Sequence, residues 1–221
     1  MARDFVKMSK EWFDKQAPIY DETDTILYSK YGKISCKYIY DYLKNKEYKN
    51  LLDVGCGTGY LINMLSKEKD AEYNGLDLSS EMIKQANSKN IKNAKFIEGK
   101  SDELPFEDNT FDIVTCSQSF HHYPETDKPL KEALRVLKPN GLYILSDTGV
   151  GPFGCVGAKI DDFVIVCMLL LKKWGNLYVS GAISLGMADV QPISTRCGKR
   201  LQRARQDIPQ CSIFYGRCFS G

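Results

Sequence analysis

Residues Leu51–Tyr60 read LLDVGCGTGY, an apolar run that ends in an aspartate and is followed by three alternating glycines. A short apolar run stopped by glycines predicts a buried strand that leads into a tight turn. Gly55 and Gly57 let the backbone of that turn approach a ligand closely, because no Cβ atom intrudes. Taken alone, the stretch fits either a nucleoside-binding loop or a turn that holds nothing.

Strand and helix patterns alternate along the chain around this turn. Short apolar runs predict strands over Leu51–Val54, Tyr73–Asp77, Lys95–Ile97, Phe111–Cys116 and Leu142–Leu145. Apolar residues at helical spacing predict helices over Ser9–Ala17, Lys33–Leu43, Tyr60–Lys69, Met82–Asn90 and Pro129–Leu137, the last ending at the turn-forming Lys138–Gly141. Alternation of this kind implies crossover connections. We therefore expect an α/β, doubly wound, mostly parallel sheet with helices on both faces.

Two aspartates narrow the choice of ligand. Asp77 ends the next predicted strand, where a carboxylate can accept both hydroxyls of a ribose. The alternative is that Asp77 caps the following helix, although Ser79 or Ser80 could do so instead. Asp53 directly precedes the glycine turn, and its charge opposes a pyrophosphate but suits an ammonium or sulfonium group. The residues favour a cationic nucleoside.

The composition sets further bounds. The chain has 221 residues, 43% of them hydrophobic, and a net charge of +2, so nucleic acid is not an expected partner. The N-terminus shows no secretory signal, and the longest apolar run, Phe163–Leu171, is too short to span a membrane. The eight cysteines form no C-x-x-C pair. We expect reduced thiols, no bound metal and a cytoplasmic location.

The apolar run after the fifth predicted strand has two interpretations. Its apolar residues are Phe163, Val164, Val166, Cys167, Leu170 and Leu171. They could form one helix buried against the sheet, which is the favoured interpretation, or they could line a site for a hydrophobic acceptor.

Composition changes again near Gly181. The segment 181–221 holds six basic residues, five of them arginine, and two acidic ones. Its origin could be a frame change, a fusion or a divergent native tail. It offers one plausible helix, Gly198–Gln206, and one apolar stretch, Cys211–Tyr215, so incomplete C-terminal strands are expected. An exposed sheet edge would follow, which favours a homodimer.

Five stretches occur in an order and spacing that resemble a known family. They are FDKQAPIYDE (13–22), LLDVGCGTGY (51–60), GLDLSSEMIKQA (75–86), FIEGKSDELPFEDNTFDIV (96–114) and SFHHYPETDKPLKEALRVLKPNGLYILSD (119–147). The chain resembles the class I S-adenosylmethionine-dependent methyltransferases, in particular the type 11 group that includes the ubiquinone and menaquinone methyltransferases. The resemblance implies a Rossmann-like methyltransferase sheet, S-adenosylmethionine as cofactor, S-adenosylhomocysteine as product and a small-molecule acceptor.

The resemblance also implies a division of the chain. A methyltransferase domain would span 1–180, with a helical cap (1–48), a cofactor-binding core (49–147) and a substrate-side segment (148–180). The basic tail, 181–221, would follow it.

The resemblance assigns roles to individual residues. The methionine part of the cofactor would lie near Asp53, Gly55, Cys56, Gly57 and Ser117, and the ribose hydroxyls would bind Asp77. Leu78 and Met82 would contact the adenine or ribose, and Ser101 would meet the adenine through its backbone NH. Tyr20 would close over the cofactor. Lys100 replaces the aspartate that commonly binds the adenine amine in this family. Asp102 or a backbone carbonyl would take that role.

Methyl transfer from a sulfonium is an in-line displacement, so alignment and exclusion of water matter most. A general base is needed only if the acceptor must lose a proton. His121 and His122 follow the fourth predicted strand; either His122 assists deprotonation or orients the acceptor, or both histidines only shape a loop. Two alternatives stay open: a catalytically silent S-adenosylmethionine-binding protein, and a nicotinamide-dependent oxidoreductase. Asp53 and the incomplete G-x-G-x-x-G argue against the second.

Overall fold

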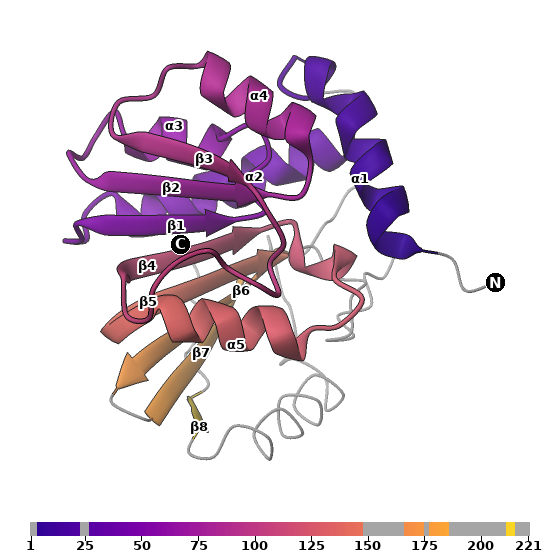
Figure 1. The fold of residues 1–221 in the computed structure, drawn as a ribbon. Helices are drawn as coiled ribbons and strands as arrows, with labels where there is room; N and C mark the ends of the chain where they lie inside the picture. The colour runs from indigo at the N-terminus through magenta and orange to yellow at the C-terminus, as the bar shows by residue number, and fades with distance from the viewer. Residues whose placement is uncertain (1–3, 23–26, 148–165, 175–176, 186–210, 215–221) are drawn as a thin grey trace.

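The computed structural model describes residues 4–22, 27–147, 166–174, 177–185 and 211–214 (Figure 1). The helices are α1 (Phe5–Gln16), α2 (Leu27–Leu43), α3 (Tyr60–Leu65), α4 (Ser80–Ser88) and α5 (Asp127–Val136), with 3₁₀ turns η1 (Ala17–Ile19) and η2 (Phe120–His122). The strands are β1 (Asn50–Val54), β2 (Glu72–Asp77), β3 (Ala94–Glu98), β4 (Phe111–Ser117), β5 (Leu137–Asp147), β6 (Val166–Trp174), β7 (Leu177–Leu185) and β8 (Cys211–Phe214).

The strands form one sheet in the order β3-β2-β1-β4-β5-β6-β7-β8. Strands β1 to β5 pair in parallel, and their order reverses between β1 and β4. This arrangement confirms the prediction of a doubly wound, mostly parallel sheet. In such sheets, ligands bind beyond the carboxyl ends of the strands at the point of reversal. The glycine turn after β1 therefore lies where a ligand site is expected.

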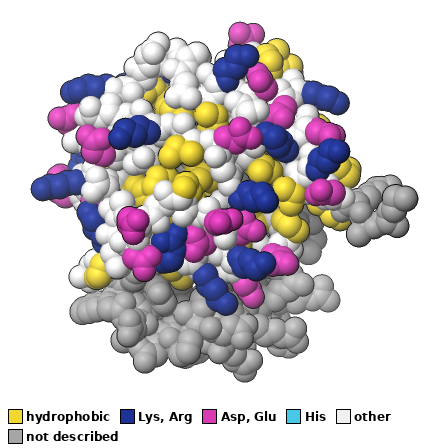
Figure 2. All heavy atoms as spheres, viewed as in Figure 1, with side chains coloured by type: hydrophobic (Ala, Val, Ile, Leu, Met, Phe, Trp, Pro, Cys, Tyr) yellow, Lys and Arg dark blue, Asp and Glu magenta, His cyan; other side chains and the backbone are white. Residues whose placement is uncertain are grey.

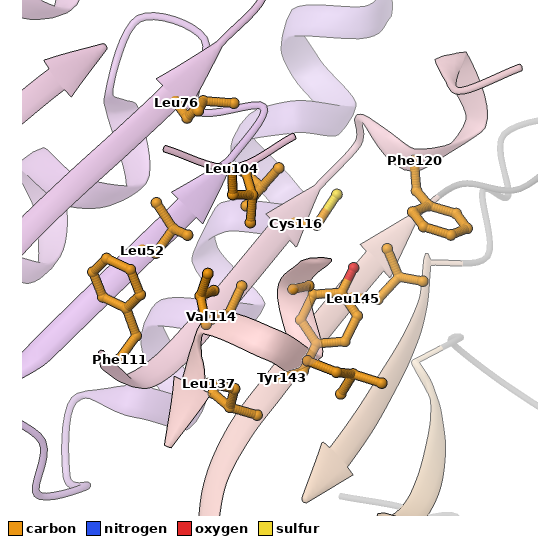
Figure 3. Close-up of a cluster of buried hydrophobic side chains, with 14 residues drawn as sticks. Leu52, Leu76, Leu104, Phe111, Val114, Cys116, Phe120, Leu137, Tyr143 and Leu145 are labelled. Carbon is orange, nitrogen blue, oxygen red and sulfur yellow. The ribbon is translucent and has the colours of Figure 1, made fainter. Parts of the chain in front are cut away.

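Helices cover both faces of the parallel strands. Successive residues of a strand point to opposite faces, so each strand contributes to two buried clusters. Leu52 and Val114 belong to a buried cluster that includes residues of α5, and Figure 3 shows its side chains. Leu51 and Ile113, one position earlier in each strand, belong to a second cluster with residues of α2 and α3. Burial on both faces explains why these strands read as continuous apolar runs.

The structure corrects the prediction of a helix over the apolar run Phe163–Leu171. The described part of that run, Val166–Leu171, belongs to strand β6, which pairs antiparallel with β5 from Cys167 opposite Asp147 to Lys172 opposite Leu142. A run without polar interruptions carries neither helical nor strand periodicity, so pairing with β5 decides its conformation. Phe163 and Val164 lie outside the described residues.

The sheet continues past β6. Strand β7 pairs antiparallel with β6 and contains the predicted boundary between residues 180 and 181. The apolar stretch expected at Cys211–Tyr215 supplies β8, which pairs parallel with β7. The helix expected over Gly198–Gln206 lies outside the described residues.

The end of α5 also differs from its prediction. The helix ends at Val136, and Leu137 already pairs with Phe111 as the first residue of β5. The Lys138–Gly141 segment therefore lies within β5 and does not form a separate turn. It is irregular, with a register shift and with Asn140 at a φ of 65°. The turn-forming residues Pro139, Asn140 and Gly141 therefore mark an irregularity within the strand.

Candidate functional site

Residues at the carboxyl ends of the parallel strands line a cavity of about 310 Å³. Figure 1 shows helix α1 beside these strand ends. Its wall comes from the glycine turn after β1, the ends of β2 and β4, the loop after β3, and the N-terminal helices α1 and α2. Segments far apart in sequence thus meet around one space. This is the position that the fold favours for a ligand.

The glycine turn needs its glycines for two different reasons. Gly55, Gly57 and Gly59 have φ values of 76°, 52° and 73°, in the left-handed region that side chains disfavour. A Cβ atom on Gly55 would collide with the side chain of Ser119. A Cβ atom on Gly57 would meet no atom within 4 Å, and Gly57 lines the cavity. The backbone at Gly57 therefore leaves room for a bound group.

Asp77 closes the cavity wall at the end of β2. Its Oδ2 atom accepts a hydrogen bond from the Gly57 amide (2.8 Å) and its Oδ1 atom accepts one from the Ser79 amide (2.9 Å). The Ser79 hydroxyl accepts from the amide of Met82 and so forms the side-chain cap of α4. Asp77 is therefore not the residue that caps the first turn of the helix. Burial raises the pKa of its carboxyl group.

Asp53 is the second acidic group in the wall. It is only 2% exposed, and its Oδ1 atom accepts a hydrogen bond from the Thr115 hydroxyl (2.7 Å). Burial raises the pKa of Asp53 to about 7, the Thr115 hydrogen bond opposes this rise, and the nearby Asp77 charge adds to it. A cationic ligand group beside Asp53 would favour its ionised form.

The end of β4 contacts α2 through hydroxyl groups. The Ser117 hydroxyl donates to Ser35 (2.9 Å), which donates to Ser146 of β5 (2.6 Å). Ser35 and Ser146 are fully buried, and Ser117 lines the cavity. The thiol of Cys36 lies 3.7 Å from the Ser117 hydroxyl. These contacts hold α2 at a fixed position over the site.

One side of the cavity is built from α4 and the loop after β3. Leu78, Met82, Ser101 and Asp102 line it, and Met82 is a buried residue of α4. Lys100 also lines the cavity and is exposed. Asp102, one of the two predicted partners of an adenine amine, thus lines the cavity together with Lys100.

The two histidines have different surroundings. His122 lines the cavity, and its ring packs edge-on against Phe13 of α1 with centroids 5.1 Å apart. Burial, followed by the neighbouring His121, lowers the pKa of His122 to about 4. The His121 ring nitrogen Nδ1 lies 2.8 Å from Asp147 Oδ1, and its backbone amide donates to the same carboxylate. His121 is not among the residues that line the cavity.

The cavity brings together all the predicted cofactor-binding residues. They are Tyr20, Asp53, Gly55, Cys56, Gly57, Asp77, Leu78, Met82, Ser101, Asp102 and Ser117. His122 joins them, whereas His121 does not.

Sequence reasoning missed several contacts of the N-terminal segment. Lys10 of α1 donates to the Leu78 carbonyl (3.0 Å), and Asp14 accepts from the Ser79 hydroxyl (2.5 Å). The FDKQAPIYDE stretch identified the segment, but no local pattern showed which residues it contacts. Asp21, next to Tyr20, makes a further contact that is described below.

No helix within the described ranges has the length and apolar character needed to cross a bilayer. On the face shown in Figure 2, basic and acidic side chains are interspersed.

Comparison with known proteins identifies the family. Residues 52–145 match the family model described as a methyltransferase domain, Methyltransf_11. The ubiquinone/menaquinone biosynthesis C-methyltransferase UbiE of Rickettsia typhi is 40% identical over 105 residues, which cover 43% of this chain and 42% of that protein. The demethylmenaquinone methyltransferase of Listeria welshimeri is 33% identical over 142 residues, covering 62% of this chain and 60% of that protein.

A solved structure agrees with the fold. It is a complex between the Haloferax volcanii Trm112 methyltransferase activator and a putative methyltransferase. The likeness has a TM-score of 0.52 and 25% identity and covers 67% of this chain and 62% of that one. The chain spans less than two thirds of the length of the curated relatives that it matches. The matched core carries the glycine turn, Asp77 and the strand-end residues of the cavity wall, and residues 52–145 therefore belong to a class I S-adenosylmethionine-dependent methyltransferase domain of the type 11 group.

Proposed function

We propose that the chain transfers a methyl group from S-adenosylmethionine to a small molecule. The observation that carries the proposal is the pairing of open backbone at Gly57 with two acidic groups, Asp53 and Asp77, in the wall of one cavity. Open backbone suits a bulky ligand, and the two carboxyl groups suit an ammonium group and ribose hydroxyls. The match to a methyltransferase domain supports the same ligand.

The residues of the wall fit that cofactor group by group. Asp53 would hold the ammonium group of its methionine part, with Ser117 beside it, and Asp77 would hold the ribose hydroxyls. Leu78 and Met82 would contact the ribose or the adenine. Bound S-adenosylmethionine supplies a methyl group on a positively charged sulfur, which is already an activated leaving group. The task left to the protein is to align the acceptor and exclude water.

His122 is the residue that we assign to the acceptor side. Its low pKa keeps the imidazole neutral near pH 7. A neutral imidazole can accept or donate one hydrogen bond at the mouth of the cavity and so orient an acceptor. Deprotonation of the acceptor is a second role for the same ring, because a neutral imidazole can accept a proton; burial opposes the charged product.

The acceptor class is inferred from the relatives. The names of two of them refer to quinone methylation and that of a third to fatty-acid O-methylation. We infer a small-molecule acceptor on this basis.

Calorimetric titration with S-adenosylhomocysteine, S-adenosylmethionine and NAD tests the ligand. We expect binding of the first two and loss of most of that binding in Asp77→Asn, with NAD as the negative control. Incubation with a metabolite panel and S-adenosylmethionine, followed by mass spectrometry, tests the reaction. Binding of NAD alone would refute the proposal. Cofactor binding without S-adenosylhomocysteine release on any acceptor would favour a catalytically silent protein.

A further inference from the structure

Three residues from distant parts of the chain bond to one another at the edge of the cavity. The Thr58 hydroxyl, inside the glycine turn, donates to Asp21 Oδ1 at 2.7 Å. Lys89 Nζ lies 2.6 Å from Asp21 Oδ2. Lys89 Nζ also donates to the Thr58 carbonyl at 2.6 Å. Asp21 therefore uses both carboxylate oxygens, and the three residues close a ring of contacts.

The ring lies in a setting that strengthens charged contacts. Thr58 is 2% exposed, and the side chains of Lys89 and Asp21 are 22% and 35% exposed. Exposed ion pairs on protein surfaces contribute little, but partial burial and shared hydrogen bonds increase the contribution. Lys89 is also the residue that caps the C-terminus of α4, where the helix dipole favours a positive charge.

The ring of Asp21, Thr58 and Lys89 is next to Tyr20, which lines the cavity. Asp21 directly follows Tyr20, which lines the cavity, as do Asp21 and Thr58 themselves. The Tyr20 carbonyl accepts from the Ser29 hydroxyl at 2.8 Å, and the Asp21 carbonyl accepts from Lys33 at 3.0 Å. Backbone contacts thus attach this segment to α2, while the Asp21 side chain attaches it to the glycine turn.

The N-terminal segment has a second, separate attachment. In α1, Lys10 and Asp14 bond to the end of β2 and to the start of α4. Those contacts hold the helix but do not reach the glycine turn. Among the hydrogen bonds and ion pairs described for the segment, the Asp21 side chain alone links it to the glycine motif. Loss of the Asp21 side chain would therefore release the segment from the glycine turn, while α1 and the backbone contacts with α2 stay in place.

We propose that Asp21 and Lys89 are positioning residues that keep Tyr20 closed over the cofactor by bonding it to Thr58 of the glycine turn. The inference rests on the proposed function, because the retained ligand is S-adenosylmethionine or its product. The open segment would bind the ligand less well. The apparent dissociation constant rises in inverse proportion to the population of the closed state.

The test uses the full chain and variants that keep side-chain size. Asp21→Asn and Lys89→Met each remove one charge of the ring. We expect each to raise the dissociation constant of S-adenosylhomocysteine on the order of tenfold and to speed its release. The double variant should lose no more than either single variant, because both disrupt one interaction. Lys89→Arg, which keeps the charge, should restore most of the affinity.

A matched control and a ligand-free readout separate positioning from general destabilisation. Asp70 and Lys92 form an exposed ion pair, at 3.2 Å, outside the cavity wall. Asp70→Asn and Lys92→Met should leave the dissociation constant unchanged. In the free protein, hydrogen exchange at the Tyr20 and Glu22 amides, which donate to Ala17 and Ile19, should accelerate in Asp21→Asn while α1 stays protected.

The outcomes distinguish the two proposals. If the unaltered protein binds neither S-adenosylmethionine nor its product, the proposed function fails and the inference fails with it. If the unaltered protein binds the product and both ring variants match the Asp70→Asn control in affinity and release rate, only the inference fails. Additive losses in the double variant would also overturn it, because they would show that Asp21 and Lys89 act independently.

Discussion

The buried carboxyl group of Asp53 should make the stability of the ligand-free protein depend on pH. Its pKa of about 7 in the folded chain compares with 3.8 for an exposed aspartate. A raised acidic pKa means that the fold favours the protonated form. The contribution that Asp53 makes to the free energy of unfolding is fully present below pH 3.8 and is lost as the pH rises to 7. The ligand-free protein should therefore become less stable toward neutral pH through this one residue.

The size of the effect follows from the two pKa values. A rise from 3.8 to about 7 corresponds to about 4 kcal/mol in the free energy of unfolding. Between pH 5 and pH 8 the loss is about 3 kcal/mol, because the unfolded carboxyl group is already ionised at pH 5.

Asp53→Asn tests this reasoning because asparagine keeps the shape and cannot ionise. Its Oδ1 atom can still accept the hydrogen bond from Thr115. Urea denaturation of the free protein at pH 5 and pH 8 measures the free energy of unfolding of each variant. We expect the change in the free energy of unfolding from pH 5 to pH 8 to be more favourable in Asp53→Asn by about 3 kcal/mol. A constant offset from the new amide cancels in this comparison.

An equal pH dependence in the two proteins would refute the argument. It would mean that Asp53 is ionised in the folded state at pH 5, so burial does not control its charge. If the pH dependences of the two proteins differ by only a third of the expected amount, the pKa of Asp53 lies well below 7, closer to the value of an exposed aspartate than the structure indicates. Raised groups that do not interact with Asp53 titrate in the same way in both proteins and do not affect the difference.

Three further predictions concern the glycine turn, α4 and His122. Gly55→Ala should prevent stable folding, because the new Cβ atom would collide with Ser119. Gly57→Ala should lower the free energy of unfolding by only about 1 kcal/mol but abolish S-adenosylhomocysteine binding. Thermal denaturation measures the first effect and calorimetry the second. Ser79→Ala removes the α4 cap and should lower the free energy of unfolding by about 1 kcal/mol in urea denaturation. His122 is neutral above pH 5, so kcat of His122→Gln should keep the wild-type pH profile from pH 6 to 9; an inflection lost in the variant would contradict this.

The parallel half of the fold was predictable because its signals are local. Strands β1 to β4 agree with their predictions to one residue at each end, since apolar runs and turn residues mark them. Gly55, Gly57 and Asp77 lie at strand ends, and parallel strands bring those ends to one edge of the sheet. The part of the cavity wall at these strand ends therefore follows from topology.

Contacts between distant segments were not predictable from the same patterns. Residues Val166–Leu171 form a strand because β5 is beside them, and nothing in the run itself specifies that partner. Asp21 and Lys89 are ordinary charged residues in sequence, and only the fold brings them together. His121 and His122 are adjacent in the chain, yet only the structure shows that Asp147 holds one ring while the other faces the cavity.

The two amide contacts of Asp77 also bear on the thermodynamics of binding. Because Gly57 and Ser79 already donate to its two oxygens, the carboxylate is held in one rotamer before any ligand arrives. Each oxygen keeps a second lone pair, so incoming hydroxyl groups can bond without displacing either amide. Binding then orders no side chain at this point, and little conformational entropy is lost there. The carboxylate is pre-organised, and its contribution to affinity should be mainly enthalpic.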